Sequence, residues 1–192
     1  MESNDSAVDT RSPDPFNQTR APVSEEALQL YRHLSAGVAI LSAQSESGPI
    51  GLTASSVTSL SLRPPMLSAN LAEHSYTLSA IRASQVFGVQ LLADTQHTLA
   101  RDFASPNGKR FSRYEHQHIG GVPVLTDSLG WAVCALVDAR RYGDHVLIVG
   151  EVTALGVSAG RSPLIWHNQG FVHVGSALPL MATTRVEPEA AR

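Results

Sequence analysis

The chain has 192 residues, of which 43% are hydrophobic and 16% charged, and its formal net charge is -3. This length and composition predict one globular domain with its own core. The acidic balance, together with the lack of a basic run, argues against a nucleic-acid partner. No apolar stretch is long enough for a membrane span, and residues 1–22 lack the apolar core of a signal peptide, so we expect a cytoplasmic protein without a membrane partner.

Composition divides the chain into three parts. Residues 1–22 are rich in Ser, Asp and Pro and are expected to form a flexible N-terminal arm. Residues 23–175 form the predicted domain, and residues 176–192 are expected to be a loose C-terminal tail. Ser24, followed by two glutamates, predicts the N-terminus of a short helix that leads into the domain.

Short runs rich in β-branched and aromatic residues dominate the domain and predict strands. Two helices are expected among them, at residues 75–83 and 95–104, and residues 105–121 are expected to form a long surface loop. The predicted strands cover residues 38–41, 66–71, 86–92, 131–137, 146–152 and 171–174. Because strands outnumber helices, we predict a mainly β fold of barrel type.

The most distinctive segment is Gly51-Leu-Thr-Ala-Ser-Ser, which opens a hydroxyl-rich run ending at Pro65. Hydroxyls fall on both faces of the run, so some of them share a face with apolar side chains. Such hydroxyls and the backbone N–H groups around them suit the polar edge and phosphate of a flavin. A polar edge strand is the alternative interpretation.

Three further features along the chain carry possible chemistry. Ser75 and Thr77 stand at a predicted helix start, where hydroxyls and free N–H groups bind anions or simply cap the helix. Cys134 lies in an apolar run and is expected to be a buried thiol. His145 follows Gly143-Asp144 at the start of a predicted strand, as either a structural or a functional histidine.

No metal site is predicted. His116 and His118 alternate in sequence beside Glu115, but no third or fourth ligand stands at a recognisable spacing. Glycine-rich dinucleotide and P-loop fingerprints are also missing, so a nucleotide has to be bound in another way.

Residues 28–174 resemble the flavin reductase family, whose members supply reduced flavin to two-component monooxygenases. The resemblance rests most on the hydroxyl block with its Pro64-Pro65 and on Gly143-Asp-His145, in this order and spacing. It implies an FMN-binding split β-barrel (Greek key) with a few short helices. It also implies an NAD(P)H:flavin oxidoreductase that transfers hydride from NADH, the expected donor, to FAD or FMN, works as a homodimer and serves a partner monooxygenase.

The resemblance assigns roles to individual positions. His145 is expected near the flavin and the nicotinamide, where it positions a ring or offsets charge. The residues expected at the bound nucleotides are Gly51, Thr53, Ala54, Ser55, Ser56, Asn70, Leu71, Ala72, Ser75, Thr77, Phe103, Arg110, His145 and His167. Asn168 departs from the family pattern, because it stands where the resemblance leads us to expect an arginine at the nicotinamide nucleotide.

Two other functions remain compatible with the residues. The same barrel can retain flavin as a sensor or electron carrier without turning over NADH, which the departure at Asn168 keeps open. Related split barrels oxidise pyridoxamine phosphate, although that substrate calls for more cationic residues near its phosphate than this sequence offers.

Overall fold

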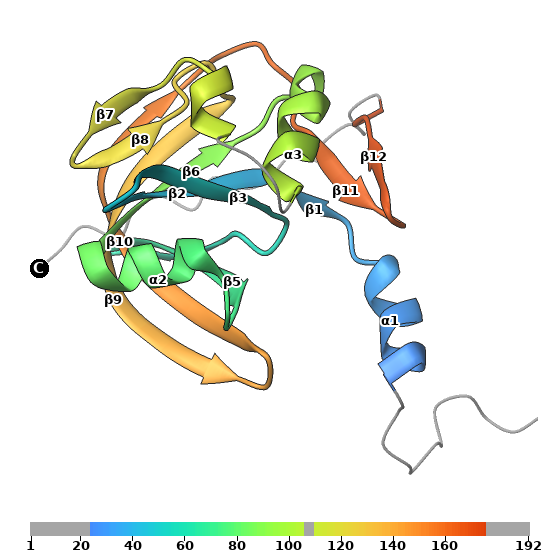
Figure 1. The fold of residues 1–192 in the computed structure, drawn as a ribbon. Helices are drawn as coiled ribbons and strands as arrows, with labels where there is room; N and C mark the ends of the chain where they lie inside the picture. The colour runs from blue at the N-terminus through green and yellow to red at the C-terminus, as the bar shows by residue number, and fades with distance from the viewer. Residues whose placement is uncertain (1–23, 106–109, 176–192) are drawn as a thin grey trace, which may run out of the picture.

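A computed structural model of the chain describes residues 24–105 and 110–175. The predicted N-terminal arm and C-terminal tail lie outside these residues. Within them the chain is mainly β, with three short α-helices (Figure 1). The helices are α1 Ser24–Arg32, α2 Tyr76–Ser84 and α3 His97–Ala104, and two 3-10 turns, η1 Asp94–Gln96 and η2 Arg110–Arg113, accompany them.

A seven-stranded antiparallel sheet forms the body of the fold, in the spatial order β3-β2-β6-β9-β10-β5-β4. Its strands are β2 Ala39–Ser45, β3 Gly48–Ala54, β4 Thr58–Leu62, β5 Pro65–Ala72, β6 Val86–Leu91, β9 Gly130–Tyr142 and β10 His145–Val157. A three-stranded sheet contains β1 Ala36–Gly37, β11 Ile165–His167 and β12 Gly170–Val172, and β7 Gln117–Ile119 pairs with β8 Val122–Val124.

The large sheet is split rather than closed. Its two edge strands, β3 and β4, follow each other in the chain and are joined only by residues 55–57, yet they do not pair. The sheet curves so that β3 comes close to β5 on the far side of the opening. This arrangement confirms the predicted split barrel, and it leaves one edge of β3 without a ladder partner.

Two apolar clusters hold α2 and α3 against the sheet. One joins α2 to β2, β6 and β10, through buried residues such as Leu78, Phe87 and Ile148. The other lies under α3 and includes Phe103 and Phe111, whose rings meet edge to face at a centroid distance of 5.0 Å. The buried thiol of Cys134, as predicted, belongs to the first cluster.

The segment from Ser105 to Gly121 is not the long loop that its composition predicted. Its described part contains η2 and β7, and the side chain of Phe111 is only 4% exposed. Phe111 anchors the segment in the core under α3, and Tyr114 packs against the same cluster. Two aromatic residues among polar ones are too few for a periodic pattern, so the sequence did not indicate this anchor.

Across residues 24–105 and 110–175, no helix is long and apolar enough to cross a bilayer. Within the same ranges, no group of three or more His, Cys, Asp and Glu side chains is arranged to hold a metal ion.

Candidate active site

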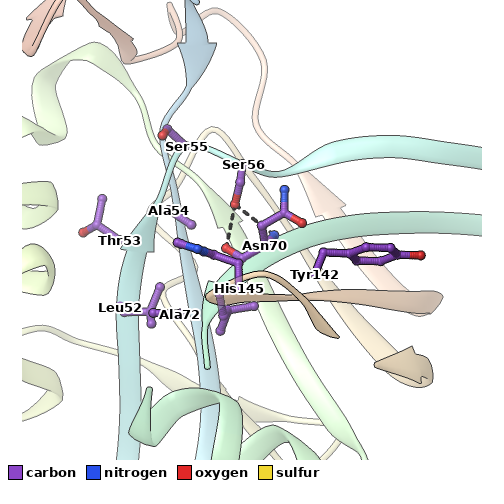
Figure 2. A pocket seen from close by; sticks show the side chains of 10 residues that line it. Leu52, Thr53, Ala54, Ser55, Ser56, Asn70, Ala72, Tyr142 and His145 are labelled. Atoms are coloured by element: carbon purple, nitrogen blue, oxygen red, sulfur yellow. Dashed lines mark hydrogen bonds between the residues drawn. The ribbon is translucent and has the colours of Figure 1, made fainter. Parts of the chain in front are cut away.

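A hollow of about 650 Å³ opens between β3 and β5, at the split of the large sheet (Figure 2). This size falls within the range of small-molecule and cofactor sites. Ten residues from three places in the chain line it. They are Leu52, Thr53, Ala54, Ser55, Ser56, Asn70, Leu71, Ala72, Tyr142 and His145.

Strand pairing brings His145 to this hollow. The strands β9 and β10 are joined by the two residues Gly143 and Asp144, and Gly143 has a φ of 60°. Glycine at the first position of such a turn matches the right-handed twist of the flanking strands. His145 then stands opposite Tyr142 on one side and Ala72 of β5 on the other.

A hydrogen bond orients the imidazole of His145. Its Nδ1 lies 2.9 Å from Oδ1 of Asp144. Because a carboxylate only accepts hydrogen bonds, Nδ1 carries a proton, and in the neutral form of the ring Nε2 is then an acceptor. The hydrogen bond from His145 lowers the pKa of Asp144. The two side chains are neighbours in sequence, but they meet because Asp144 belongs to the turn and does not alternate with His145 on the strand.

Ser56 joins the two sides of the opening. Its hydroxyl donates to the Asn70 carbonyl at 2.9 Å and accepts from the Asn70 amide at 3.0 Å (Figure 2). Thr58 pairs with Ser68 in the ladder between β4 and β5, so Ser56 stands at the register position opposite Asn70. The Ser56 hydroxyl therefore makes the two hydrogen bonds to Asn70 that a residue of the ladder would make through its backbone.

Thr53 ties β3 to a helix. Its hydroxyl donates to the carbonyl of Ala100 in α3 at 2.6 Å. Gly51, two residues earlier, has no room for a side chain, since a Cβ there would lie 2.8 Å from the Leu41 carbonyl. Arg110 donates hydrogen bonds to the carbonyls of Gly51 and Ser105, and its burial lowers the pKa of its guanidinium. These contacts fix the backbone of the hydroxyl block through Ala100, Leu41 and Arg110, which do not line the hollow.

Several polar groups in the hollow have no partner among the described residues. They are the hydroxyl of Ser55, the side-chain amide of Asn70 and Nε2 of His145. The side chain of His145 is 50% exposed. With the open edge of β3, these groups offer donors and acceptors to a planar ring bearing N–H and C=O groups, so the residues present fit the isoalloxazine of a flavin.

Eight predicted site residues are brought together in the hollow: Thr53, Ala54, Ser55, Ser56, Asn70, Leu71, Ala72 and His145. Leu52 and Tyr142 also line it and were not predicted. Tyr142 could have been predicted from the sequence, because a two-residue Gly-Asp turn places the residue before it directly opposite His145.

The other predicted residues lie outside the lining of this hollow. Phe103 and Thr77 are buried, at 0% and 2% exposed. Arg110 donates to the carbonyl of Gly51, so both residues stabilise the hydroxyl block without lining the hollow. Ser75 is the N-cap of α2, where its Oγ accepts from the Leu78 amide at 3.4 Å. His167 lies on β11, and its Nδ1 is 2.9 Å from Oγ of Ser35.

The structure gives a local reason for Asn168. Asn168 and Gln169 have φ values of 46° and 62° and form the two-residue turn between β11 and β12. Such turns require positive φ, which asparagine tolerates better than most residues. The Asn168 amide also donates to the Arg32 carbonyl at 2.9 Å, so the turn is fastened to the end of α1.

Comparison with known proteins identifies relatives over 121 to 144 residues of the chain. A probable flavin reductase of Rhizobium meliloti is 37% identical over 121 residues, covering 62% of this chain but only 39% of its own length. An NADH:FMN oxidoreductase of Rhodococcus qingshengii is 34% identical over 144 residues, covering 72% of this chain and 74% of its own. The reductase component of a 4-nitrophenol 4-monooxygenase/4-nitrocatechol 2-monooxygenase from Rhodococcus opacus is 33% identical over 141 residues, with 73% and 76% covered.

Solved structures agree with this relationship. The flavin reductase domain protein of Arthrobacter sp. FB24 superposes with a TM-score of 0.77 at 28% identity, covering 83% of this chain and 100% of that one. The family profile described as "Flavin reductase like domain" matches residues 31–175. The chain therefore belongs to the flavin reductase like family, as its hydroxyl block and its Gly-Asp-His motif predicted.

Proposed function

We propose that the chain is an NAD(P)H-dependent flavin reductase, which binds FAD or FMN in the hollow between β3 and β5 and transfers hydride to it from NADH. One observation carries the proposal: the split of the sheet brings the hydroxyl block and His145, about 90 residues apart in sequence, to one cavity of cofactor size. Family membership supports the same activity, since relatives are named NADH:FMN oxidoreductase and flavin reductase.

The residues of the hollow bind and orient in this proposal. The open edge of β3 and the Ser55 hydroxyl face the polar edge of the flavin, and the Asn70 amide reaches it from β5. His145 presents Nε2 to a donor such as a carboxamide N–H, with its ring held by Asp144. Bound flavin supplies the hydride acceptor, and the protein aligns it with the nicotinamide.

The first experiment is steady-state oxidation of NADH and NADPH by the purified protein, with FAD, FMN or riboflavin added in turn. Flavin-dependent loss of the reduced-nicotinamide absorbance is expected, and the most active pair identifies donor and acceptor. A protein that binds flavin but oxidises neither donor would overturn the proposal in favour of a non-catalytic flavin-binding module. The names of the relatives do not favour that alternative.

A partner monooxygenase belongs to the proposal. The Rhodococcus opacus relative is the reductase component of a monooxygenase, which supports the same place for this chain. Reduced flavin released here would then be the substrate of a separate oxygenase. A cytoplasmic location also belongs to the proposal, because nicotinamide and flavin nucleotides are abundant in that compartment.

A homodimer is the oligomeric state we propose. Large apolar side chains are exposed on the edge strand β4 and on the C-terminal part of β10, where a second copy would cover them. They include Leu60 and Leu62 on β4 and Leu155 and Val157 on β10, at 54%, 85%, 62% and 82% exposed. Light scattering at micromolar concentration is expected to give twice the chain mass, and Leu155→Asp with Val157→Asp to give a monomer. A monomeric parent protein would contradict the dimer without touching the reductase assignment.

A further inference from the structure

A second, smaller hollow of about 240 Å³ lies between two parts of the chain. On one side are η1 and α3, and on the other are β12, Leu164 and His173. Asp94, His97 and Arg101 line it from the helical side, and Leu164, Phe171 and His173 from the opposite side. None of these residues lines the first hollow. In Figure 1 this place is the junction of α3 with the small sheet of β11 and β12.

Arg101 is a cation without a carboxylate partner in the part of the chain that the structure describes. Its guanidinium instead lies over the ring of Phe171, with Cζ 5.8 Å from the ring centroid. Contact with an aromatic face holds a guanidinium in place without neutralising it. Because arginine pairs bidentately with phosphate oxygens, Arg101 at the mouth of a cavity is suited to a phosphate or pyrophosphate group.

The rest of the lining is not that of a simple anion site. Asp94 is an acceptor there, and its Oδ2 is 3.7 Å from Nδ1 of His173. A carboxylate beside a phosphate-binding group commonly accepts from the hydroxyls of a ribose. Leu164, which is buried, and the half-buried Phe171 add an apolar surface of the kind on which a base packs. Cation, carboxylate and apolar wall thus match phosphate, ribose and base.

The two hollows flank the same helix. Thr53, in the lining of the first, donates to the carbonyl of Ala100, and the next residue, Arg101, lines the second. The hollows thus lie on either side of α3, and a molecule with its reactive ring in one and its nucleotide in the other would span this helix. The flavin reductase proposed above has such substrates, and the present inference rests on that function.

We propose that the hollow beside Arg101 binds the adenosine diphosphate group of a dinucleotide substrate. NADH and FAD both carry this group, whereas FMN does not. Arg101 binds the phosphates and Asp94 the ribose hydroxyls. If the group is that of NADH, the carboxylate of Asp94 also disfavours a phosphate on the ribose, and the site selects NADH over NADPH.

Arg101→Gln tests the site, with Arg82→Gln as the matched control. Arg82 is an exposed arginine in the last turn of another helix, α2, and lines neither hollow. Initial rates are measured for the parent and both variants with NADH and with reduced nicotinamide mononucleotide, which lacks the adenosine, using FMN as the acceptor. Affinities for FAD and FMN are measured in parallel by fluorescence titration.

If the group comes from NADH, Arg101→Gln raises the KM for NADH about tenfold, the size expected for one lost charge-assisted hydrogen bond, and leaves the KM for the mononucleotide unchanged. If the group comes from FAD, the same variant weakens FAD binding about tenfold and leaves FMN binding and the KM for NADH unchanged. Equal changes for all ligands, or no change relative to Arg82→Gln, overturn the site.

Asp94→Asn tests the selectivity separately. It is expected to raise kcat/KM for NADPH relative to NADH by about tenfold, because the repulsion of the ribose phosphate is removed. Where Arg101→Gln has raised the KM for NADH, an unchanged ratio overturns the role of Asp94.

Direct titration of the purified protein with ADP separates this inference from the proposed function. If the protein reduces flavin but binds no ADP up to millimolar concentration, the site is refuted and the reductase stands. If it fails to reduce flavin yet binds ADP in a way that Arg101→Gln weakens, the site stands and the reductase assignment fails.

Discussion

His145 shows how one hydrogen bond decides what a side chain offers to a substrate. Asp144 accepts from Nδ1 at 2.9 Å, so in the neutral form of the ring Nε2 is the acceptor. The carboxylate itself is 93% exposed, and the imidazole of His145 is its side-chain partner. Its function here is therefore to position the imidazole.

Replacing His145 by Ala is expected to slow flavin reduction in stopped flow by roughly 10- to 100-fold, the effect of losing one strong hydrogen bond to a reacting group. The dissociation constant for FMN is expected to change by less than about threefold, since most flavin contacts come from β3 and β5. His33→Ala, at an exposed position after α1, is the control. Unchanged reduction rates in His145→Ala would remove this residue from the mechanism.

Ser56 is the second residue whose role depends on its partners. Its Oγ makes two bonds to the Asn70 backbone. Ser56→Ala leaves a carbonyl and an amide without them, so we expect a loss of about 1 to 2 kcal/mol in the free energy of unfolding and weaker flavin binding. Urea titration and flavin fluorescence measure the two effects.

Ser59→Ala is the matched control for Ser56→Ala, because Ser59 is exposed on β4 and its hydroxyl has no partner among the described residues. If both variants unfold at the same urea concentration, the two bonds of Ser56 contribute nothing to stability.

At the scale of elements, close contact between strands depends on glycine. A Cβ at Gly150 of β10 would lie 2.7 Å from Cβ of Cys134 and would overlap the ring of Phe87. The absence of a side chain at Gly150 therefore lets Phe87 and Cys134 pack directly against the backbone of β10. The two neighbours are buried, so they have little room to move.

Gly150→Ala is accordingly expected to lower the free energy of unfolding by about 3 kcal/mol, or to prevent folding, because overpacking forces backbone shifts. Gly37→Ala is the control, since a Cβ there meets nothing within 4 Å and its φ is not positive. Thermal unfolding followed by circular dichroism compares the two variants. An equal melting temperature for both would show that the core at Gly150 repacks at no cost.

Most elements follow from local patterns, and their boundaries were altered by tertiary contacts. The helix expected at residues 75–83 is α2 Tyr76–Ser84, with Ser75 as its N-cap. The helix expected at residues 95–104 is divided into η1 and α3. Strand β10 runs on to Val157, beyond the predicted end at residue 152, because its pairing with β9 continues through exposed residues. Propensity does not record such pairing.

At the scale of the whole molecule, the ionisation of the Cys134 thiol depends on whether the core around it is folded. Burial raises the pKa of its thiol from 9.0 to about 12. Between these values the unfolded chain gives up a proton that the folded chain keeps, so the free energy of unfolding falls as the pH rises through this window. Below pH 9 the contribution is constant.

We expect the parent protein to lose about 1 kcal/mol more stability than Cys134→Ala between pH 7 and about pH 10. Urea titrations of both proteins at the two pH values measure the difference. Parallel losses would mean that the thiol is as accessible to solvent in the folded state as in the unfolded one. At pH 8, a thiol reagent is expected to modify the native protein far more slowly than the unfolded protein.

The sequence by itself determined the mainly β class, and its resemblance to the flavin reductase family implied the split barrel and eight of the ten residues that line the first hollow. The class and the motifs that carry the resemblance depend on near neighbours: short runs of β-branched and aromatic residues, the hydroxyl run and the Gly-Asp turn before His145. Residues close in sequence limit each other's backbone and hydrogen bonds directly, so their pattern can be read without coordinates.

Only the tertiary structure decided which hydroxyls are free for a ligand. Thr53 donates to Ala100 and Ser56 to Asn70, whereas Ser55 keeps its hydroxyl. It also placed Phe103 and Thr77 in the core, and it brought Arg101 and Phe171 together, 70 positions apart in the chain. Each outcome depends on partners supplied by strand register and helix packing. Those contacts join distant residues, and no local pattern encodes them.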